Sequence, residues 1–358
     1  MIRVFMVGMS TDKGGVESYI KNLCEHLDPK EFEIVYAWPE MEIEGKKWIQ
    51  PPNRHNYIKY TKFWHEFFEQ NKFDVVYYDA CDIVSVDLLK IAKKVGVPVR
   101  IIHSHNTAIQ FKKRWFHYIT EKNNRKCIGN IATNLLACSE EAGKWMFNDN
   151  KFIVIKNGID LQTYIFSKQF REECRKSIGV KKEYLVGCVG RLDPQKNPLM
   201  SVNIMDRIKG LNDNVKFVFI GDGELRKEVE KSIYEKKLQD KVSVLGARDD
   251  VNKWYSALDC LLMPSLFEGL PFTLVEAQAS GLPCVVSDTV SSKADLTGLV
   301  QYIGLEEGLD IWTDKILEEC QMVRRDMTQQ LVRAGYSITD TANQVSEIIK
   351  KELERLDI

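Results

Sequence analysis

Paired cysteines and long apolar runs are both missing from this sequence. None of its nine cysteines is spaced Cys-x-x-Cys, and the closest two, Cys127 and Cys138, are eleven residues apart. This spacing excludes a zinc knuckle and argues against a disulfide framework. No apolar stretch approaches the roughly 18 residues of a membrane-spanning helix. The stretch from Val4 to Met9 is too short for a signal-peptide core, and we therefore expect a cytosolic protein.

The sequence also lacks an excess of charge of either sign. It has 50 Lys and Arg residues against 51 Asp and Glu residues, a net charge of −1. A dedicated nucleic-acid-binding protein would usually be strongly basic, so that class is disfavoured. The length of 358 residues, with 44% of them apolar, is sufficient for two or three domains with sizeable cores.

The sequence does contain a regular alternation of short β-branched runs and helix-length amphipathic segments. In one such segment Val16, Ile20, Leu23 and Leu27 recur on a single helical face. This alternation predicts α/β domains in which helices cover parallel sheets. Strands are expected at 2–8, 33–36, 74–78, 99–104, 134–138 and 152–155, and again at 184–189, 215–220, 241–245, 259–263 and 284–287.

The alternation restarts midway along the chain, which predicts two Rossmann-like domains. We expect the first at residues 1–165 and the second at 166–340, followed by a closing helix within 341–358. The break begins at Asn157-Gly158, a turn signal. Ligands of open α/β sheets bind beyond the carboxyl ends of the strands. Two facing domains would therefore form one composite site across a cleft.

Two motifs lie at strand ends of the first expected domain. Gly14-Gly15 separates the first strand from its helix, where glycines let backbone N–H groups approach a phosphate or a sugar. Without Gly-x-Gly-x-x-Gly spacing, this pair alone is better explained as a flexible turn. His103 and His105 end another strand, where a histidine can bond a substrate hydroxyl. His105 is favoured because it lies nearer the exit of the strand.

A basic loop, residues 190–197, follows a core strand of the second expected domain. Arg191 offers a planar fork to two phosphate oxygens, and Lys196 offers a mobile point charge. The pair suits a diphosphate. Two solvated surface charges are the alternative, which the position after a core strand disfavours.

The most specific motif is the segment from Pro264 to Ala277. A buried strand leads into a loop with Glu268, and Glu276 lies in the helix that follows. If the whole intervening segment were helical, the two glutamates would be about 12 Å apart, close to the reach of a nucleotide-sugar. Backbone N–H groups at the helix start can hold phosphate. Glu276 can accept two hydrogen bonds from a ribose diol.

With these motifs the chain resembles the retaining GT-B glycosyltransferases of family 4 over nearly its whole length, most of all the bacterial capsule and exopolysaccharide transferases. The shared motifs are Gly14-Gly15-Val16-Glu17, His105-Asn106, Lys156-Asn157-Gly158-Ile159-Asp160, Gly190-Arg191-x4-Lys196, Gly221-Asp222-Gly223 and the pair Glu268-x7-Glu276. The resemblance implies two Rossmann-like domains facing across a cleft. It also implies that the C-terminal helix packs back toward the first domain.

The resemblance implies a role for each site residue. Arg191 and Lys196 would bind the donor diphosphate, and Glu276 would bind the ribose. Glu268 would contact the donor sugar at the reacting centre, and His105 would contact that sugar from the other domain. The remaining donor-binding residues would be Gly15, Gly269, Leu270, Phe272 and Thr273.

The implied reaction moves a sugar from a nucleotide-sugar, expected to be UDP-linked, to a glycan or a polyprenyl-diphosphate-linked acceptor. The anomeric configuration would be retained by front-face attack, with the leaving phosphate taking the proton of the acceptor. Arg191 and Lys196 would stabilise the charge that grows on the leaving group. Other sugar-nucleotide transferases bring a divalent cation to the diphosphate through Asp-x-Asp. No such pair occurs in this sequence, so no metal ion or other cofactor is expected.

The segment 110–126 is both basic and aromatic. It contains six basic residues and one acidic residue, Glu121, which gives a net charge of +5, and four aromatic residues lie between them. This composition is typical of a segment that lies on an anionic membrane surface. We expect Lys112, Lys113, Arg114 and Trp115 to face the acceptor side at the inner membrane leaflet. The alternative is a solvated helix whose aromatic residues pack into their own domain.

Three other functions are compatible with the architecture. A sugar-nucleotide epimerase on the same fold is the main alternative, and product analysis with the donor alone would distinguish it from a transferase. A nicotinamide-dependent oxidoreductase would need Gly-x-Gly-x-x-Gly after the first strand, a pattern that is absent there. A non-catalytic binding module is disfavoured because the paired glutamates and the Arg/Lys loop are all present.

Overall fold

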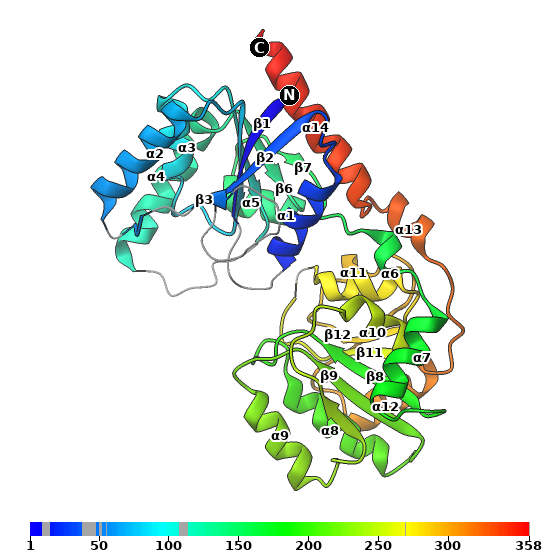
Figure 1. Ribbon diagram of the computed structural model, residues 1–358. Helices are drawn as coiled ribbons and strands as arrows, with labels where there is room; N and C mark the ends of the chain where they lie inside the picture. Colours follow the sequence, from blue (N-terminus) through cyan, green and yellow to red (C-terminus); the bar gives the residue numbers. More distant parts are fainter. Residues whose placement is uncertain are drawn as a thin grey trace. The chain divides into compact units, whose positions relative to one another are not determined.

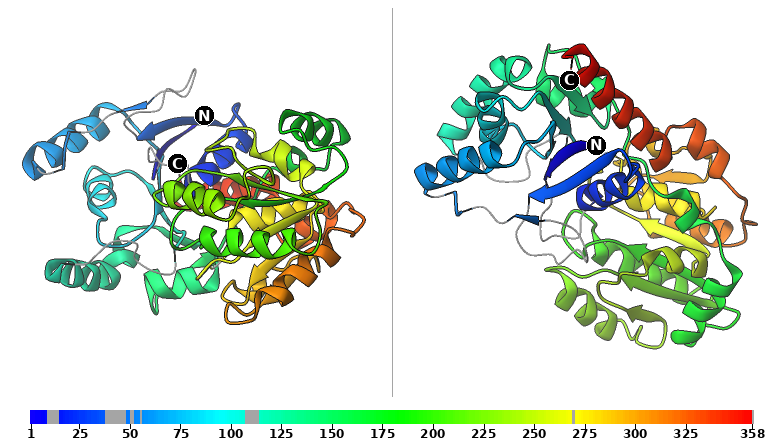
Figure 2. Two further views of the ribbon diagram at one scale, coloured as in Figure 1. Left: turned by 90° about the horizontal axis from the view of Figure 1, so that it is seen from below. Right: turned by 45° about the horizontal axis from the view of Figure 1, so that its top comes forward.

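The computed structural model describes residues 1–8, 15–37, 48–49, 52–54, 56–106, 114–268 and 270–357. The chain forms two compact units, one of residues 1–159 with 335–358 and one of residues 160–334 (Figure 1; Figure 2). It passes from one unit to the other at Ile159/Asp160 and at Ala334/Gly335. These points lie within six residues of the expected boundaries at 165/166 and 340/341.

The first unit is built on a seven-stranded parallel sheet in the order β3-β2-β1-β4-β5-β6-β7. All of these strands except β3 lie where the alternation predicts them. β3 has only two residues, which is too short for a hydrophobic pattern to reveal. The strands are β1 (Ile2–Val7), β2 (Phe32–Ala37), β3 (Trp48–Ile49), β4 (Val75–Ala80), β5 (Val99–Ser104), β6 (Asn134–Ala137) and β7 (Ile153–Val154).

Helices cover both faces of this sheet. On one face Phe5 of β1 lies among a group of aromatic rings, with Trp64 and Phe67 at centroid distances of 5.4 and 5.3 Å. Burial of each such ring contributes about 2–3 kcal/mol to stability. That face is covered by α2 (Tyr57–Gln70), α3 (Asp87–Lys94), α4 (Trp115–Ile131) and α5 (Glu140–Phe147), and the other face by α1 (Gly15–His26) and α14 (Ile338–Arg355) (Figure 1).

The C-terminal helix α14 returns to the first unit, as predicted, and packs against α1. Lys350 of α14 pairs with Glu31 at 2.6 Å, and Thr341 donates to the carbonyl of Lys156 at 3.1 Å. Gly158 lies so close to α14 that a Cβ would stand 2.6 Å from Thr341 Oγ1. The motif at 156–160 is therefore also a packing surface for the closing helix.

The second unit contains a six-stranded parallel sheet in the order β10-β9-β8-β11-β12-β13. The bounds of β8, β9 and β12 are those expected, whereas β13 was not predicted. The strands are β8 (Tyr184–Val189), β9 (Val215–Ile220), β10 (Val242–Val244), β11 (Cys260–Met263), β12 (Cys284–Ser287) and β13 (Val300–Ile303). The two sheets confirm the GT-B class of architecture, two Rossmann-like units.

Two hydrophobic cores lie on the two faces of this second sheet. Helices α8 (Pro198–Lys209), α9 (Arg226–Glu235) and α12 (Leu309–Glu319) contribute to one core, and α7 (Lys168–Ser177), α10 (Val251–Ala257) and α11 (Phe272–Ala279) to the other. Shorter elements complete the unit: α6 (Leu161–Tyr164), a 3₁₀ turn at Ser292–Ala294 and α13 (Thr328–Arg333).

Candidate functional site

The two most specific motifs of the sequence lie on neighbouring strands of the second sheet. The chain leaves β8 toward β9 and β10 on one side, then returns to β11 and continues to β12 and β13 on the other. The order therefore reverses between β8 and β11. In open α/β sheets the carboxyl ends of the strands at such a reversal are where ligands bind. The loops at 190–197 and 264–271 leave these two ends.

Hydrogen bonds connect the two loops. The N–H of Leu266 donates to the carbonyl of Gln195 at 2.8 Å, and the side chain of Gln195 donates to the carbonyl of Phe267 at 3.1 Å. Lys196 Nζ lies 2.6 Å from Glu268 Oε1. The fold thus joins two predicted site residues, one cationic and one anionic, that are 72 positions apart in the sequence.

Lys196 and Arg191 have different surroundings although they share a loop. The side chains of the Lys196–Glu268 pair are 19% and 9% exposed, whereas Arg191 is 73% exposed and lies 3.4 Å from Asp193. Gly190 has φ +137°, and a Cβ there would stand 3.3 Å from Lys196 Cε. Gly190, Arg191 and Lys196 line a small cavity at the end of β8.

Residues after β12 hold the loop that carries Glu268. The hydroxyls of Ser287 and Thr289 donate to the carbonyl of Ser265 at 2.5 and 2.6 Å. The N–H of Ser291 donates to the carbonyl of Glu268 at 3.2 Å. The loop is therefore held at two of its backbone carbonyls, those of Ser265 and Glu268.

The helix α11 begins at Phe272, so Glu268 lies on the preceding loop, and the 12 Å separation for a fully helical segment does not apply. The N–H groups of Phe272 and Thr273 have no acceptor within a helix that starts there. In the sequence Phe272 comes four positions after Glu268 of the ion pair. The predicted Gly269 lies outside the described residues.

Two tyrosines hold the carboxylate of Glu276. Tyr255 of α10 donates to Oε2 at 2.6 Å, and Tyr164 of α6 donates to Oε1 at 2.9 Å. Burial raises the pKa of Glu276, and the two hydrogen bonds oppose that rise because they favour the ionised form. Sequence reasoning missed both tyrosines. The only signal was the place of Tyr164, four residues after Asp160 of the 156–160 motif.

In the first unit the imidazole of His105 is buried against Asp79. His105 Nε2 lies 2.7 Å from Asp79 Oδ1, and neither side chain has exposed surface. His103 lies beside them, with Nδ1 2.9 Å from the hydroxyl of Tyr77 and 3.3 Å from that of Tyr19. The contact of His105 with a donor sugar stays a prediction. Asp79, which sequence reasoning missed, ends β4 next to β5.

The pKa values of the two histidines are shifted in opposite directions. Burial and the charge of His105 lower the pKa of His103 well below its ordinary value. Burial acts in the same direction on His105, but hydrogen bonds to Asp79 and Cys138 and the charge of Asp79 outweigh it and raise the pKa to about 9. His103 is thus shifted toward the neutral imidazole and His105 toward the imidazolium, while burial raises the pKa of Asp79 and the bond to His105 opposes that rise.

Asp79, His103 and His105 are also ligand types that metal ions prefer, and one atom of each lies within 4.8 Å of the others. One polar atom of each side chain takes part in a hydrogen bond, Asp79 Oδ1 with His105 Nε2 and His103 Nδ1 with the hydroxyl of Tyr77. The predicted absence of a metal ion in the reaction stays a prediction.

The remaining predicted residues lie at the start of two helices of the first unit. Gly15 is the first residue of α1, and Arg114 directly precedes α4, whose first residue is Trp115. Trp115 is 75% exposed, and Tyr118 and Ile119 on the next turn are each more than half exposed. Gly14, Lys112 and Lys113 lie outside the described residues. Within the described part of the chain, no helix is both long and apolar enough to cross a membrane.

Comparison with known families assigns both units. The model "Glycosyltransferase Family 4" matches residues 13–163, and the model "Glycosyl transferases group 1" matches residues 170–298. The first match covers β2 to β7 and the second covers β8 to β12, and together they include the Gly14-Gly15, Arg191/Lys196 and Glu268/Glu276 motifs.

Individual proteins agree with this assignment. The chain is 28% identical to the putative glycosyltransferase EpsF of Bacillus subtilis, over 93% of this chain and 92% of that protein. It is 28% identical to an Escherichia coli UDP-Gal:alpha-D-GlcNAc-diphosphoundecaprenol alpha-1,3-galactosyltransferase, over 63% of this chain and 60% of that one. The fold matches Anabaena HepE, crystallised with UDP, with a TM-score of 0.76 and 17% identity over 98% and 100% of the two chains. The chain thus belongs to the GT-B glycosyltransferases of family 4 and is a sugar-transferring enzyme rather than an epimerase or an oxidoreductase.

Proposed function

We propose that this enzyme transfers a sugar, with retention of anomeric configuration, from a UDP-sugar to a glycan carried on a polyprenyl diphosphate during assembly of a capsule or exopolysaccharide. The observation that carries the proposal is the Lys196–Glu268 pair where the strand order reverses, beside the start of the helix that holds Glu276. The crystallisation of HepE with UDP and the diphosphoundecaprenol substrate in the name of the E. coli relative support the choice of donor and acceptor.

The geometry suggests how the donor diphosphate is bound. Lys196 is held in place by Glu268, whereas Arg191 is exposed and can turn toward a ligand. The N–H groups at the start of α11 add donors for phosphate oxygens. Cations and N–H groups that already point at the leaving group stabilise its growing charge without reorganisation, which is the largest contribution to rate in many enzymes.

In this proposal Glu268 and Glu276 contact the two ends of the donor, the sugar and the ribose. Glu268 pairs with the phosphate-binding lysine and so lies where the sugar–phosphate bond would break. Glu276 accepts the ribose hydroxyls. The leaving phosphate takes the proton of the acceptor hydroxyl as the new bond forms on the same face of the sugar.

We further propose that the start of α4 docks on the anionic inner leaflet of the cell membrane. Trp115, Tyr118 and Ile119 each have more than half of their surface exposed, and Arg114 directly precedes Trp115. Each basic residue near such a surface contributes about 1 kcal/mol to binding. Docking there would bring the enzyme to a lipid-linked acceptor.

Product analysis tests the proposed reaction. The purified enzyme is incubated with a panel of nucleotide-sugars and a short-chain polyprenyl-diphosphate-linked glycan, with and without EDTA. We expect a glycosylated product in which NMR finds the anomeric configuration of the donor, at the same rate in EDTA. Nucleotide-sugars that bind should also raise the thermal unfolding temperature as their concentration exceeds the dissociation constant. An inverted product, or a rate abolished by EDTA and restored by Mg²⁺, would contradict the mechanism.

A further inference from the structure

Glu276 is approached by tyrosines from two separate helices. The hydroxyls of Tyr255 and Tyr164 each donate to a different carboxylate oxygen, at 2.6 and 2.9 Å. A carboxylate has about four acceptor positions, so about two remain. We propose that Tyr164 and Tyr255 are positioning residues that orient Glu276 so that its remaining acceptor positions receive the two ribose hydroxyls of the donor. This inference rests on the proposed function because it takes Glu276 as the ribose-binding group.

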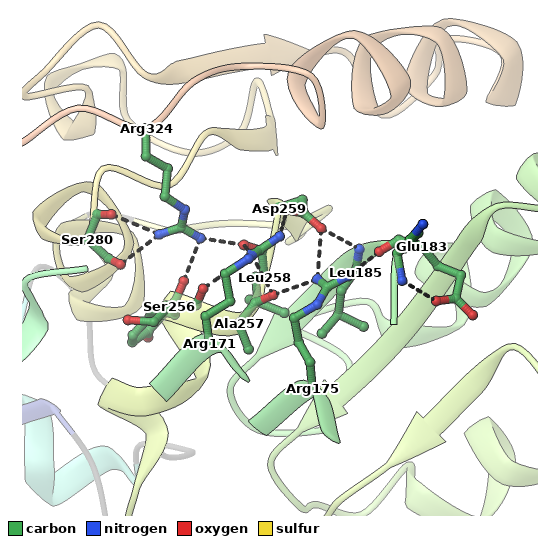
Figure 3. A network of polar contacts seen from close by, with 12 residues as sticks. Arg171, Arg175, Glu183, Leu185, Ser256, Ala257, Leu258, Asp259, Ser280 and Arg324 are labelled. Atoms are coloured by element: carbon green, nitrogen blue, oxygen red, sulfur yellow. Dashed lines mark hydrogen bonds and ion pairs between the residues drawn. The ribbon is translucent and has the colours of Figure 1, made fainter. Parts of the chain in front are cut away.

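The end of α10, where Tyr255 lies, is bonded by three arginines, Arg171, Arg175 and Arg324 (Figure 3). The last carbonyl groups of a helix have no partner within it. At the end of α10, Arg171, Arg175 and Arg324 supply partners for the carbonyls of residues 255–258, with Arg324 donating to that of Tyr255 at 2.7 Å. Asp259 pairs with Arg171 at 2.6 Å and with Arg175 at 3.1 Å. The side chain of Tyr255 is fully buried, so its hydroxyl remains on Glu276.

Tyr164 is held by α10 as well, although it belongs to α6. Asp160 caps this short helix by accepting from the N–H of Gln162 at 3.1 Å, and it also accepts from the Thr163 hydroxyl at 2.6 Å. Asn252 of α10 donates to the Thr163 carbonyl at 3.4 Å. The rings of Tyr164 and Tyr255 pack at a centroid distance of 5.9 Å. The same helix, α10, therefore holds both tyrosines, and the positions of their hydroxyls depend on it.

The two hydroxyls also affect the charge of Glu276. Burial raises the pKa of Glu276, and the bonds from Tyr255 and Tyr164 lower it. Among the described residues, the titratable groups that face this carboxyl group are those two phenols, and Asp160 acts on Tyr164. Loss of one hydroxyl should raise the pKa of Glu276, so that nucleotide binding weakens at a higher pH than in the wild type.

Binding of UDP and of 2′-deoxy-UDP, measured by calorimetry between pH 5 and 8, tests the inference. The variants are Tyr255→Phe and Tyr164→Phe, with Tyr234→Phe on the exposed face of α9 as the matched control and thermal unfolding to verify the fold. We expect wild type and control to favour UDP over its 2′-deoxy form by about tenfold. In the two variants this ratio should fall to about twofold, and the pH midpoint of UDP binding should rise.

Different results would overturn different claims. If both variants keep the wild-type ratio and pH midpoint, the tyrosines do not position Glu276. If UDP binds but Glu276→Gln also keeps the ratio, Glu276 is not the ribose ligand, and the inference fails while the donor proposal stands. If the wild type binds neither UDP, ADP nor GDP, the proposed function itself is wrong.

Discussion

At the scale of single residues, three of the four charged groups of the site are held by neighbours, whereas Arg191 is largely exposed to solvent. Lys196 is bound to Glu268, and Glu276 to two tyrosines. A charge fixed in this way needs little reorganisation when it meets a ligand. Mutations at Lys196, which binds the diphosphate, and at Glu276, which binds the ribose, should therefore change different kinetic parameters.

Lys196→Ala and Glu276→Ala should separate turnover from donor binding. Loss of Lys196 removes the charge that stabilises the leaving diphosphate, and we expect kcat to fall by about 10²- to 10³-fold. Loss of Glu276 removes a ribose contact, and we expect the KM for the donor to rise by about tenfold or more. Steady-state kinetics with varied donor measures both parameters.

The exposed ion pair Lys168–Glu172 on α7 offers matched controls, since the side chains are 85% and 70% exposed. Lys168→Ala and Glu172→Ala should leave kcat and KM unchanged. Near-wild-type kinetics in both site variants would refute the assignment of these residues.

At the scale of elements, the start of α4 and the end of α10 have contrasting roles. The first exposes an aromatic turn, and the second has its carbonyl groups covered by arginines. One is suited to contact something outside the chain, and the other to stiffen the second unit.

Charge reversal at Lys112, Lys113 and Arg114 should weaken binding to vesicles that contain anionic lipid. Three reversed charges near the surface should lower the partition coefficient by at least about 100-fold at low salt. Co-sedimentation with anionic and with neutral vesicles measures this, with reversal of the exposed Lys231 as the control. Membrane docking is refuted if the wild type does not co-sediment with anionic vesicles, or if the triple variant keeps full activity on a lipid-linked acceptor.

Arg324→Ala should destabilise the second unit. The guanidinium donates to the carbonyl and hydroxyl of Ser280 and to the carbonyls of Tyr255 and Leu258, all of which would lose a buried partner (Figure 3). We expect the free energy of unfolding to fall by about 3 kcal/mol. Urea denaturation measures the change, and Arg207→Ala, which removes a more exposed arginine, should leave the urea midpoint close to that of the wild type. Equal effects of both variants would show that the network does not stabilise α10.

At the scale of the whole molecule, two units with separate cores are joined twice by the chain, at Ile159/Asp160 and Ala334/Gly335. The closing helix belongs to the first unit, so this unit includes residues that follow the second unit in the sequence. The first unit also contains the buried Asp79–His105 pair, which makes its stability depend on pH.

Stability should decrease as the pH rises from about 6.5 to about 9. The pKa of His105 is raised to about 9 in the folded protein, above its ordinary value near 6.5. Its contribution is therefore fully present below pH 6.5 and is lost as the pH passes 9. We expect the urea midpoint of the wild type to fall across this window. His105→Gln, which cannot titrate, should show a flatter profile, and parallel profiles would contradict the assignment.

Much of the fold could be read from the sequence because buried parallel strands are short, continuous apolar runs. For β5, β8, β9 and β12 the expected bounds are those of the structure. The sequence did not predict β13 because Gln301 and Tyr302 interrupt its apolar pattern. The Arg191/Lys196 and Glu268/Glu276 motifs could likewise be recognised because each lies on one continuous stretch of chain.

The sequence by itself therefore determined the α/β class, the two-domain organisation and the loops that carry the chemistry, since these depend on local periodicity and local turns. Only the tertiary structure decided which side chains meet. Lys196 pairs with Glu268 because β8 and β11 are neighbours, and Tyr164 reaches Glu276 across 112 positions because α6 packs on α10 and α11. Contacts of this kind depend on strand order and helix packing, which no local pattern contains.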